Sequence, residues 1–263
     1  METVHTDGFS MDYLRFGHGK RDLVILPGLS VQSVMGLAPA VEQAYQPLAE
    51  AFTLRLFDRR KDLPAASSIA DMARDTLEAL RALKLEHVCL FGVSMGGMIA
   101  LEMALQDPKR IDRLALGSSA ARVTETLRRT GQRWEELAEA GDARGLYLAF
   151  GEAVYPPANF AEFREGLVRM AQSVTPQELR RFAVQVRAIE DFDVTEKLPG
   201  IACPLLVLSA RDDHVLGEGA EKTLSGRLGG RKDYACHVYE GYGHAAYDLA
   251  PDYKERLLRF FSD

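Results

Sequence analysis

The stretch HVCLFGVSMGGMIALEMAL, residues 87–105, passes from an apolar, β-favouring run directly into a run of helix-forming residues. The pattern Gly-x-Ser-x-Gly stands at the junction, and it predicts a strand over 87–93 followed by a helix over about 95–106. The motif alone is weak, because chance produces it in many chains, so its context has to decide. If a strand precedes the motif and a helix follows it, Ser94 is predicted to be a nucleophile on a sharp turn. If they do not, Ser94 is only one serine in a glycine-rich connection.

The spacing of the motif has a physical reason. A chain that reverses from strand into helix strains the backbone of Ser94, and Gly92 and Gly96 allow the close chain passage that the turn needs. The hydroxyl would project at a helix N-terminus, where free amide hydrogens and the helix dipole favour negative charge. A hydroxyl is a poor nucleophile at its own pKa, so a base and a group that orients the base are also required.

Apolar runs and helix-like stretches alternate along most of the chain. This βαβα order predicts an α/β protein with a mostly parallel sheet and helices on both of its faces. Besides 87–93, strands are expected at 9–16, 22–28, 52–58, 111–119, 204–210 and 233–240. Besides 95–106, helices are expected near 38–51, at 67–85, around 217–228 and at 250–261.

Residues 119–199 break this rhythm, because they contain helical patches and no apolar strand run. Breaks at Gly141, at Pro156-Pro157 and at Thr175-Pro176 indicate about four short helices. We therefore expect a helical insertion at 119–199 in a core formed by 1–118 and 200–263.

Composition narrows the class of protein. Of the 263 residues, 47% are hydrophobic and 27% charged, which is typical of a globular chain. The net charge of −6 lacks the basic excess of a nucleic-acid-binding protein. The N-terminus does not resemble a secretory signal and no apolar run has membrane-spanning length, so a cytoplasmic location without a membrane partner is expected. None of these features specifies an oligomeric state.

The three cysteines and the basic run at 59–61 are not expected to form functional sites. Cys89, Cys203 and Cys236 show no metal-site or disulfide spacing, so buried or half-buried free thiols and no metal are expected. The basic run of residues 59–61, Arg-Arg-Lys, is expected to be solvated on a loop, although Arg59 follows a strand end that faces the predicted site.

With GVSMGG at the turn, a helical insertion after the next strand, and an acid and a base downstream, the chain resembles the α/β-hydrolase family. The resemblance implies that 119–199 is a helical cap and that the acid follows the next strand, in LLVLSARDDHVLG. Asp213 fits the acid position because Val215, Leu216 and Gly217 then match the family pattern. Asp212 is the competitor, otherwise expected to be a solvent-facing or turn-capping carboxylate.

The same resemblance implies the base and the groups that would stabilise an oxyanion. The base is His244, in the loop YEGYGHAAYD before the C-terminal helix. The neighbouring His214 lies on the wrong loop and is expected at the surface or the rim of the pocket. The oxyanion donors would be the amide of Met95, next to Ser94, and the amide of Leu29 in LPGLS.

Together these features predict a cofactor-independent serine hydrolase that cleaves a small carboxylic ester or lactone through an acyl-enzyme. Its partner would be a small-molecule acyl substrate, as the resemblance to carboxylesterases and 3-oxoadipate enol-lactonases implies. One alternative keeps the triad and cleaves a carbon–carbon bond, or acts as a thioesterase or lyase. Another is a non-catalytic ligand-binding protein on a hydrolase scaffold.

Overall fold

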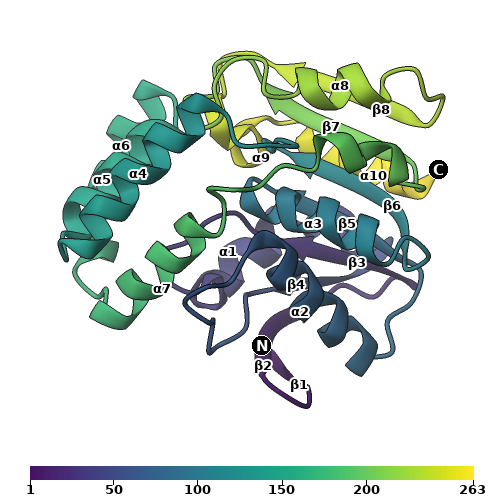
Figure 1. Ribbon diagram of the computed structural model, residues 1–263, viewed down its shortest axis with the longest axis horizontal. Helices are drawn as coiled ribbons and strands as arrows, with labels where there is room; N and C mark the ends of the chain where they lie inside the picture. Colours follow the sequence, from purple (N-terminus) through teal and green to yellow (C-terminus); the bar gives the residue numbers. More distant parts are fainter.

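An eight-stranded sheet runs through the computed structural model, which describes residues 1–263 (Figure 1). The strands are β1 (Glu2–His5), β2 (Ser10–Phe16), β3 (Arg21–Leu26), β4 (Phe52–Phe57), β5 (Val88–Val93), β6 (Ile111–Gly117), β7 (Leu205–Ala210) and β8 (Tyr234–Tyr239). Their spatial order is β1-β2-β4-β3-β5-β6-β7-β8, and only the β1–β2 and β2–β4 pairs are antiparallel. The carboxyl ends of β3 to β8 therefore meet at one edge of the sheet.

The central strands contribute to two hydrophobic cores, one on each face of the sheet. In β5, Val88 and Leu90 belong to a core of 55 buried residues, whereas Cys89, Phe91 and Val93 belong to a second core of 23. Successive side chains of a strand point to opposite faces. The strand at 88–93 is apolar throughout because both of its faces are covered.

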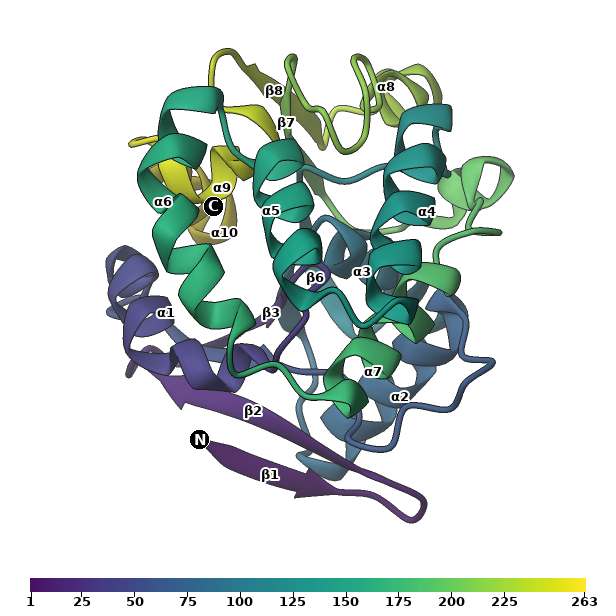
Figure 2. The same cartoon turned by 90° about the vertical axis from the view of Figure 1, so that its left-hand side faces the viewer.

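Helices cover both faces of the sheet (Figures 1 and 2). Helices α2 (Ile69–Ala82) and α3 (Met95–Gln106) pack into the larger core, and α10 (Tyr253–Ser262) packs into the smaller one. Apart from the four α-helices between β6 and β7, the remaining helices are η1 (Val34–Leu37), α1 (Ala38–Ala44), η2 (Gln46–Leu48), η3 (Thr195–Gly200), α8 (Lys222–Leu228), η4 (Gly243–Ala245) and α9 (Ala246–Leu249). None of the helices has the length and hydrophobicity needed to cross a bilayer.

Four α-helices lie between β6 and β7. They are α4 (Glu125–Glu139), α5 (Ala143–Val154), α6 (Pro157–Ala171) and α7 (Pro176–Arg187), and we call them the inserted helices. Three of them, α4 to α6, stand side by side at one end of the sheet (Figure 1). Two backbone hydrogen bonds join the ends of this segment: Val123 N donates to Phe192 O at 3.0 Å and Val194 N donates to Ala121 O at 2.9 Å. The segment therefore leaves and re-enters the sheet region at one place.

The predicted α/β class with a mostly parallel sheet is confirmed, and the differences from the predicted elements have local causes. Strand β1 was not predicted, because it is four residues long with a single buried side chain and so shows no alternation. The helix expected near 38–51 is divided into α1 and η2, with Pro47, which has no amide hydrogen, inside η2. Cys89 and Cys203 are buried, but Cys236 is exposed, contrary to the expectation for it.

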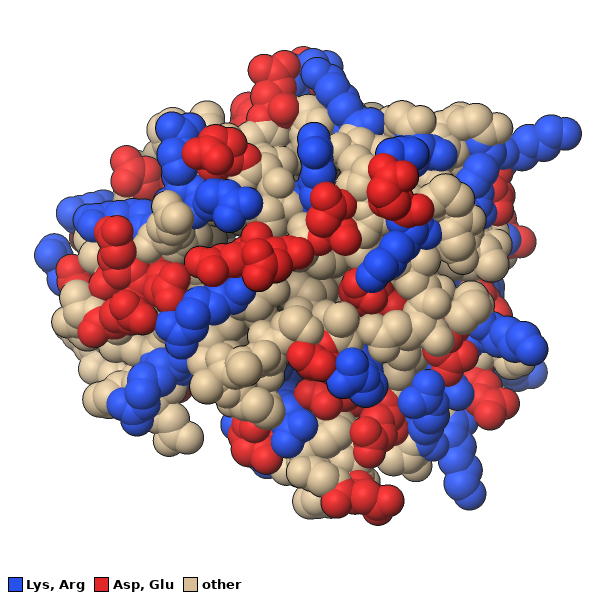
Figure 3. All heavy atoms as spheres, viewed as in Figure 1, with Lys and Arg blue, Asp and Glu red and all other residues tan.

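Charged side chains of both signs are interspersed on the face shown in Figure 3. The near balance of 38 acidic and 32 basic residues is therefore visible at the surface as neighbouring opposite charges.

Candidate active site

Ser94 is the single residue between β5 and α3. Its backbone has φ 53° and ψ −122°, a conformation that costs a residue with a side chain about 1–3 kcal/mol. The Ser94 amide donates to Gly117 O at 2.8 Å, and its carbonyl accepts a hydrogen bond from the Ser119 hydroxyl at 2.8 Å. The sharp turn predicted from the motif is present, and the residues around the end of β6 hold it in place.

Glycine is required on both sides of this turn. A Cβ at Gly92 would collide with the carbonyl oxygen of Gly96, and a Cβ at Gly96 would collide with the carbonyl oxygens of Leu26 and Pro27. Strand β5, helix α3 and the end of β3 can approach one another only because these positions lack side chains.

The strain at Ser94 has a measurable consequence. The variant Ser94→Gly is expected to be more stable than Ser94→Ala by about 1 kcal/mol, because glycine adopts positive φ without the steric cost. Urea unfolding of both variants measures the difference.

The control pair for this test is Ser225→Gly and Ser225→Ala, at a position inside α8. There alanine should be the more stable residue, as is usual in a helix. If Ser94→Ala equals or exceeds Ser94→Gly in stability, the turn is not strained.

His244 and Asp213 form a buried hydrogen-bonded pair. His244 Nδ1 lies 2.7 Å from Asp213 Oδ2, and each residue is only 3% exposed. The other carboxylate oxygen, Oδ1, accepts the amide hydrogens of Val215 at 2.9 Å and Leu216 at 2.8 Å. Because a carboxylate only accepts, Nδ1 of a neutral His244 carries the proton and Nε2 keeps a free lone pair. This pair can therefore present a base of fixed tautomer.

Asp212 has a different role from Asp213. It is half-buried, and its two oxygens accept the amide hydrogens of Gly241 and Gly243, each at 3.2 Å. Its carboxylate therefore caps the loop that leads to His244, instead of facing solvent. His214, by contrast, is exposed.

The amides of Leu29 and Met95 donate to no backbone carbonyl. Met95 begins α3, where amide hydrogens lack a partner within the helix. The loop that carries Leu29 borders Ser94, since a Cβ at Gly28 would stand 3.1 Å from the Ser94 Cβ. Free amide hydrogens next to the serine are the kind of donor that stabilises an oxyanion.

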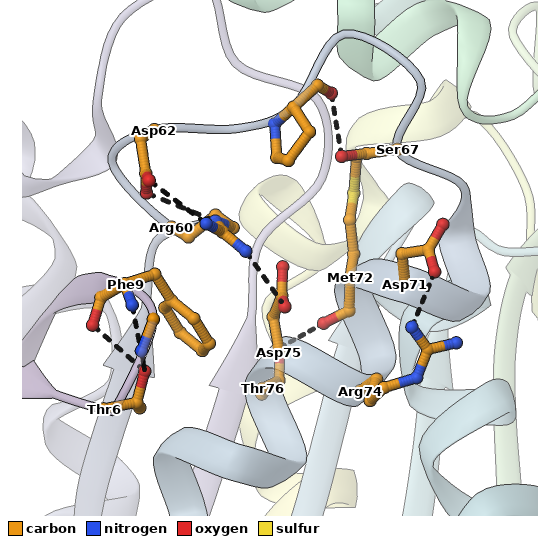
Figure 4. A network of polar contacts seen from close by, with 12 residues as sticks. Thr6, Phe9, Arg60, Asp62, Ser67, Asp71, Met72, Arg74, Asp75 and Thr76 are labelled. Atoms are coloured by element: carbon orange, nitrogen blue, oxygen red, sulfur yellow. Dashed lines mark hydrogen bonds and ion pairs between the residues drawn. The ribbon is translucent and has the colours of Figure 1, made fainter.

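The prediction that the basic run at 59–61 is solvated is wrong for its first residue. Arg59 is 6% exposed, because it turns inward just beyond β4. Arg60 instead forms ion pairs with Asp62 at 3.1 Å and Asp75 at 3.5 Å (Figure 4). Only Lys61 has the expected exposure.

A cavity of about 630 Å³ adjoins this region. Its wall includes Gly28 and Leu29 from the loop beside Ser94, and Val93, which directly precedes Ser94. Further wall residues come from 30–45 and from the inserted helices α5 and α6, of which Figure 2 shows α6 beside α1. Because 15 of the 23 lining residues are hydrophobic, the cavity suits an apolar group.

Ser94, Leu29, Asp213 and His244 all follow the carboxyl ends of parallel strands, where open α/β sheets bind their ligands. A serine on a strained strand-to-helix turn at that edge is the arrangement of the α/β hydrolases. The family model for the alpha/beta hydrolase fold matches residues 54–251, and the chain belongs to this family.

The protein is a hydrolase, as its family and the names of its relatives establish. A putative carbamate hydrolase, RutD, of Agrobacterium fabrum is 30% identical over 261 residues, which cover 92% of this chain and 95% of the relative.

Two solved structures have the same fold. MGS-M2, an α/β-hydrolase enzyme from a deep-sea metagenome library, superposes with a TM-score of 0.87 at 21% identity, covering 100% of this chain and 98% of its own. The enol-lactonase of Burkholderia xenovorans superposes with a TM-score of 0.82 at 19% identity, covering 100% of both chains.

Sequence reasoning offered turn capping as one role for Asp212 but did not identify its partners, and it did not anticipate the buried Arg59. Their positions carried a signal nevertheless, since each lies just after the carboxyl end of a buried parallel strand. Their partners are distant in sequence, and only the folded chain reveals them.

Proposed function

We propose that this hydrolase cleaves a small carboxylic ester or lactone through Ser94, His244 and Asp213. The observation that carries the proposal is the buried His244–Asp213 pair, at the sheet edge where Ser94 occupies the strained turn. The chemistry requires no cofactor, and a cytoplasmic location stays a prediction.

In the proposed reaction, Ser94 Oγ attacks the acyl carbon while His244 Nε2 takes the hydroxyl proton. Asp213 holds the imidazole and stabilises its positive charge. The Leu29 and Met95 amides would bind the oxyanion. His244 returns the proton to the leaving oxygen, which departs and leaves an acyl-enzyme. Water, deprotonated by His244, then releases the acid and restores Ser94.

A second candidate is hydrolysis of a carbamate, which the 30% identity to a putative carbamate hydrolase supports. The same residues would attack the carbamate carbonyl, so the two candidates differ in the bond cleaved and not in the nucleophile. In both, the partner is a small molecule whose apolar part fits the cavity.

The test is labelling of the wild type with a fluorophosphonate probe, followed by turnover of p-nitrophenyl esters, lactones and carbamates. Labelling with ester or lactone turnover is the expected result, and faster carbamate turnover would favour the second candidate. Labelling without turnover of any of these would favour carbon–carbon, thioester or lyase chemistry. Absence of labelling would favour a ligand-binding protein.

The cavity wall also predicts a charge preference. Its two charged lining residues, Glu178 and Asp248, are both acidic. Asp248 is exposed where it lines the cavity, so its carboxylate faces the space that a substrate would occupy. A carboxylate here would repel an anionic substrate. Asp248→Asn is therefore expected to raise the ratio of kcat/KM for an anionic ester to kcat/KM for its neutral analogue. The expected increase is about tenfold, which corresponds to about 1.4 kcal/mol.

The comparison is made on hemisuccinate and butyrate esters of p-nitrophenol. Asp252→Asn is the matched control, because it removes the same charge from a residue that pairs with Arg256 and does not line the cavity. An equal change in both variants would mean that the position of Asp248 has no special effect.

A further inference from the structure

Arg59 binds the loop that carries the Leu29 amide. Its Nη2 donates to the carbonyl oxygens of Pro27 at 2.6 Å and Gly28 at 2.8 Å. The guanidinium is buried, and burial lowers the pKa of Arg59 to about 10, so the group remains charged at neutral pH. A full positive charge therefore lies against two successive peptide groups beside Ser94.

The Gly28 carbonyl and the Leu29 N–H belong to one peptide unit. This unit is planar and trans, so its oxygen and its amide hydrogen point in opposite directions. A cation fixed on the oxygen therefore determines where the N–H points. It also polarises the peptide, which makes the N–H a stronger donor.

Arg59 is itself held from two sides. Its amide donates to Asp58 Oδ1 at 2.7 Å, and the other Asp58 oxygen accepts the Ser33 hydroxyl at 2.6 Å. From the inserted helix α7, Arg181 Nη2 donates to Asp58 Oδ1 and to Arg59 O, both at 3.1 Å. The dipeptide Asp58-Arg59 thus connects the Leu29 loop with α7.

Stability alone does not account for this arrangement. Nε and Nη1 of Arg59 are buried without a partner among the protein's groups. A buried cation with unpaired nitrogens is costly, and a well-packed apolar side chain is often equally stable in such a place.

We propose that Arg59 is a positioning residue that aims and polarises the Leu29 amide toward the oxyanion. The inference rests on the proposed acyl-transfer function, in which Leu29 is one of the two donors. Arg59 would act through the peptide and would not itself touch the substrate, so its removal should weaken transition-state binding and leave ground-state binding intact.

The test compares Arg59→Met and Arg59→Lys with the wild type, using the p-nitrophenyl ester that the wild type hydrolyses fastest. Arg59→Met is expected to lower kcat/KM about 100-fold, which is comparable to the loss of one oxyanion donor. The inhibition constant of phenylboronic acid, which forms a tetrahedral anion on serine, should rise by a similar factor. The primary amide analogue of the ester, which binds without reacting, should keep its inhibition constant within about twofold.

The lysine variant and a neighbouring arginine serve as further controls. Lysine keeps the charge and can reach a carbonyl. The kcat/KM of Arg59→Lys is therefore expected to be at least tenfold higher than that of Arg59→Met. Arg60→Met, whose side chain pairs with Asp62 and Asp75 instead (Figure 4), should retain wild-type rates. If Arg59→Met does not fold, Arg59→Lys must still show weaker boronate binding than wild type with unchanged amide binding.

Equal losses of boronate and amide binding, or no loss of either, would overturn the role of Arg59. These outcomes differ from failure of the proposed function, in which the wild type itself would bind no boronate and turn over no ester.

Discussion

The variant Ser94→Ala is expected to lower kcat/KM for the preferred substrate by a factor of about 10⁴ or more, because no other group would form the acyl-enzyme. Folding should be affected little, since the Ser94 hydroxyl makes no capping hydrogen bond to α3. Stopped-flow or steady-state hydrolysis, with fluorophosphonate labelling of the same samples, measures the loss.

Ser225→Ala is the control, because it removes a hydroxyl of α8 that bonds to Tyr234. It should keep both labelling and turnover. Labelling of Ser94→Ala to the same extent as wild type would show that another residue is the nucleophile.

The second large effect is expected at Asp213, where asparagine should lower kcat about 10³- to 10⁴-fold. Val215 and Leu216 donate to Oδ1, so the amide oxygen of the new residue would stay with them. Its NH₂ group would then face His244 Nδ1. The imidazole could meet that donor only with the proton moved to Nε2, where it can no longer accept the serine proton.

Asp212→Asn is the matched comparison, since it is the neighbouring carboxylate and the competing acid. It weakens the contacts to Gly241 and Gly243 without changing the partner of His244. We expect less than about a tenfold loss of kcat for this variant. A larger loss for Asp212→Asn than for Asp213→Asn would reverse the assignment of the acid.

The turn at Ser94 could be predicted because its signals are local. An apolar run, a glycine on each side and a following run of helix formers specify strand, turn and helix within 19 residues. The predicted helix 95–106 has the observed bounds of α3 for the same reason. The proposed acid and base lie far from Ser94 in sequence, and the resemblance, not periodicity, pointed to them.

The contacts around the oxyanion loop could not be predicted in this way. Residues 59–61 form a charged run after a strand, which is usually solvated, and the position of Arg59 next to the strand end did not show that its side chain is buried. The fold distinguishes them, because the end of β4 turns one arginine toward Pro27 and Gly28 and leaves the other beside Asp62 and Asp75.

The sequence by itself determined the alternation of strands and helices and the turn at Ser94. Periodicity and turn-forming residues act over a few positions, so one segment suffices to show them. Only the tertiary structure decided that Asp212 holds the His244 loop, that Arg59 binds the loop beside Ser94, and that α7 reaches Asp58. Each of these contacts joins residues from different elements, and their hydrogen bonds exist only after the sheet has brought the strand ends to one edge.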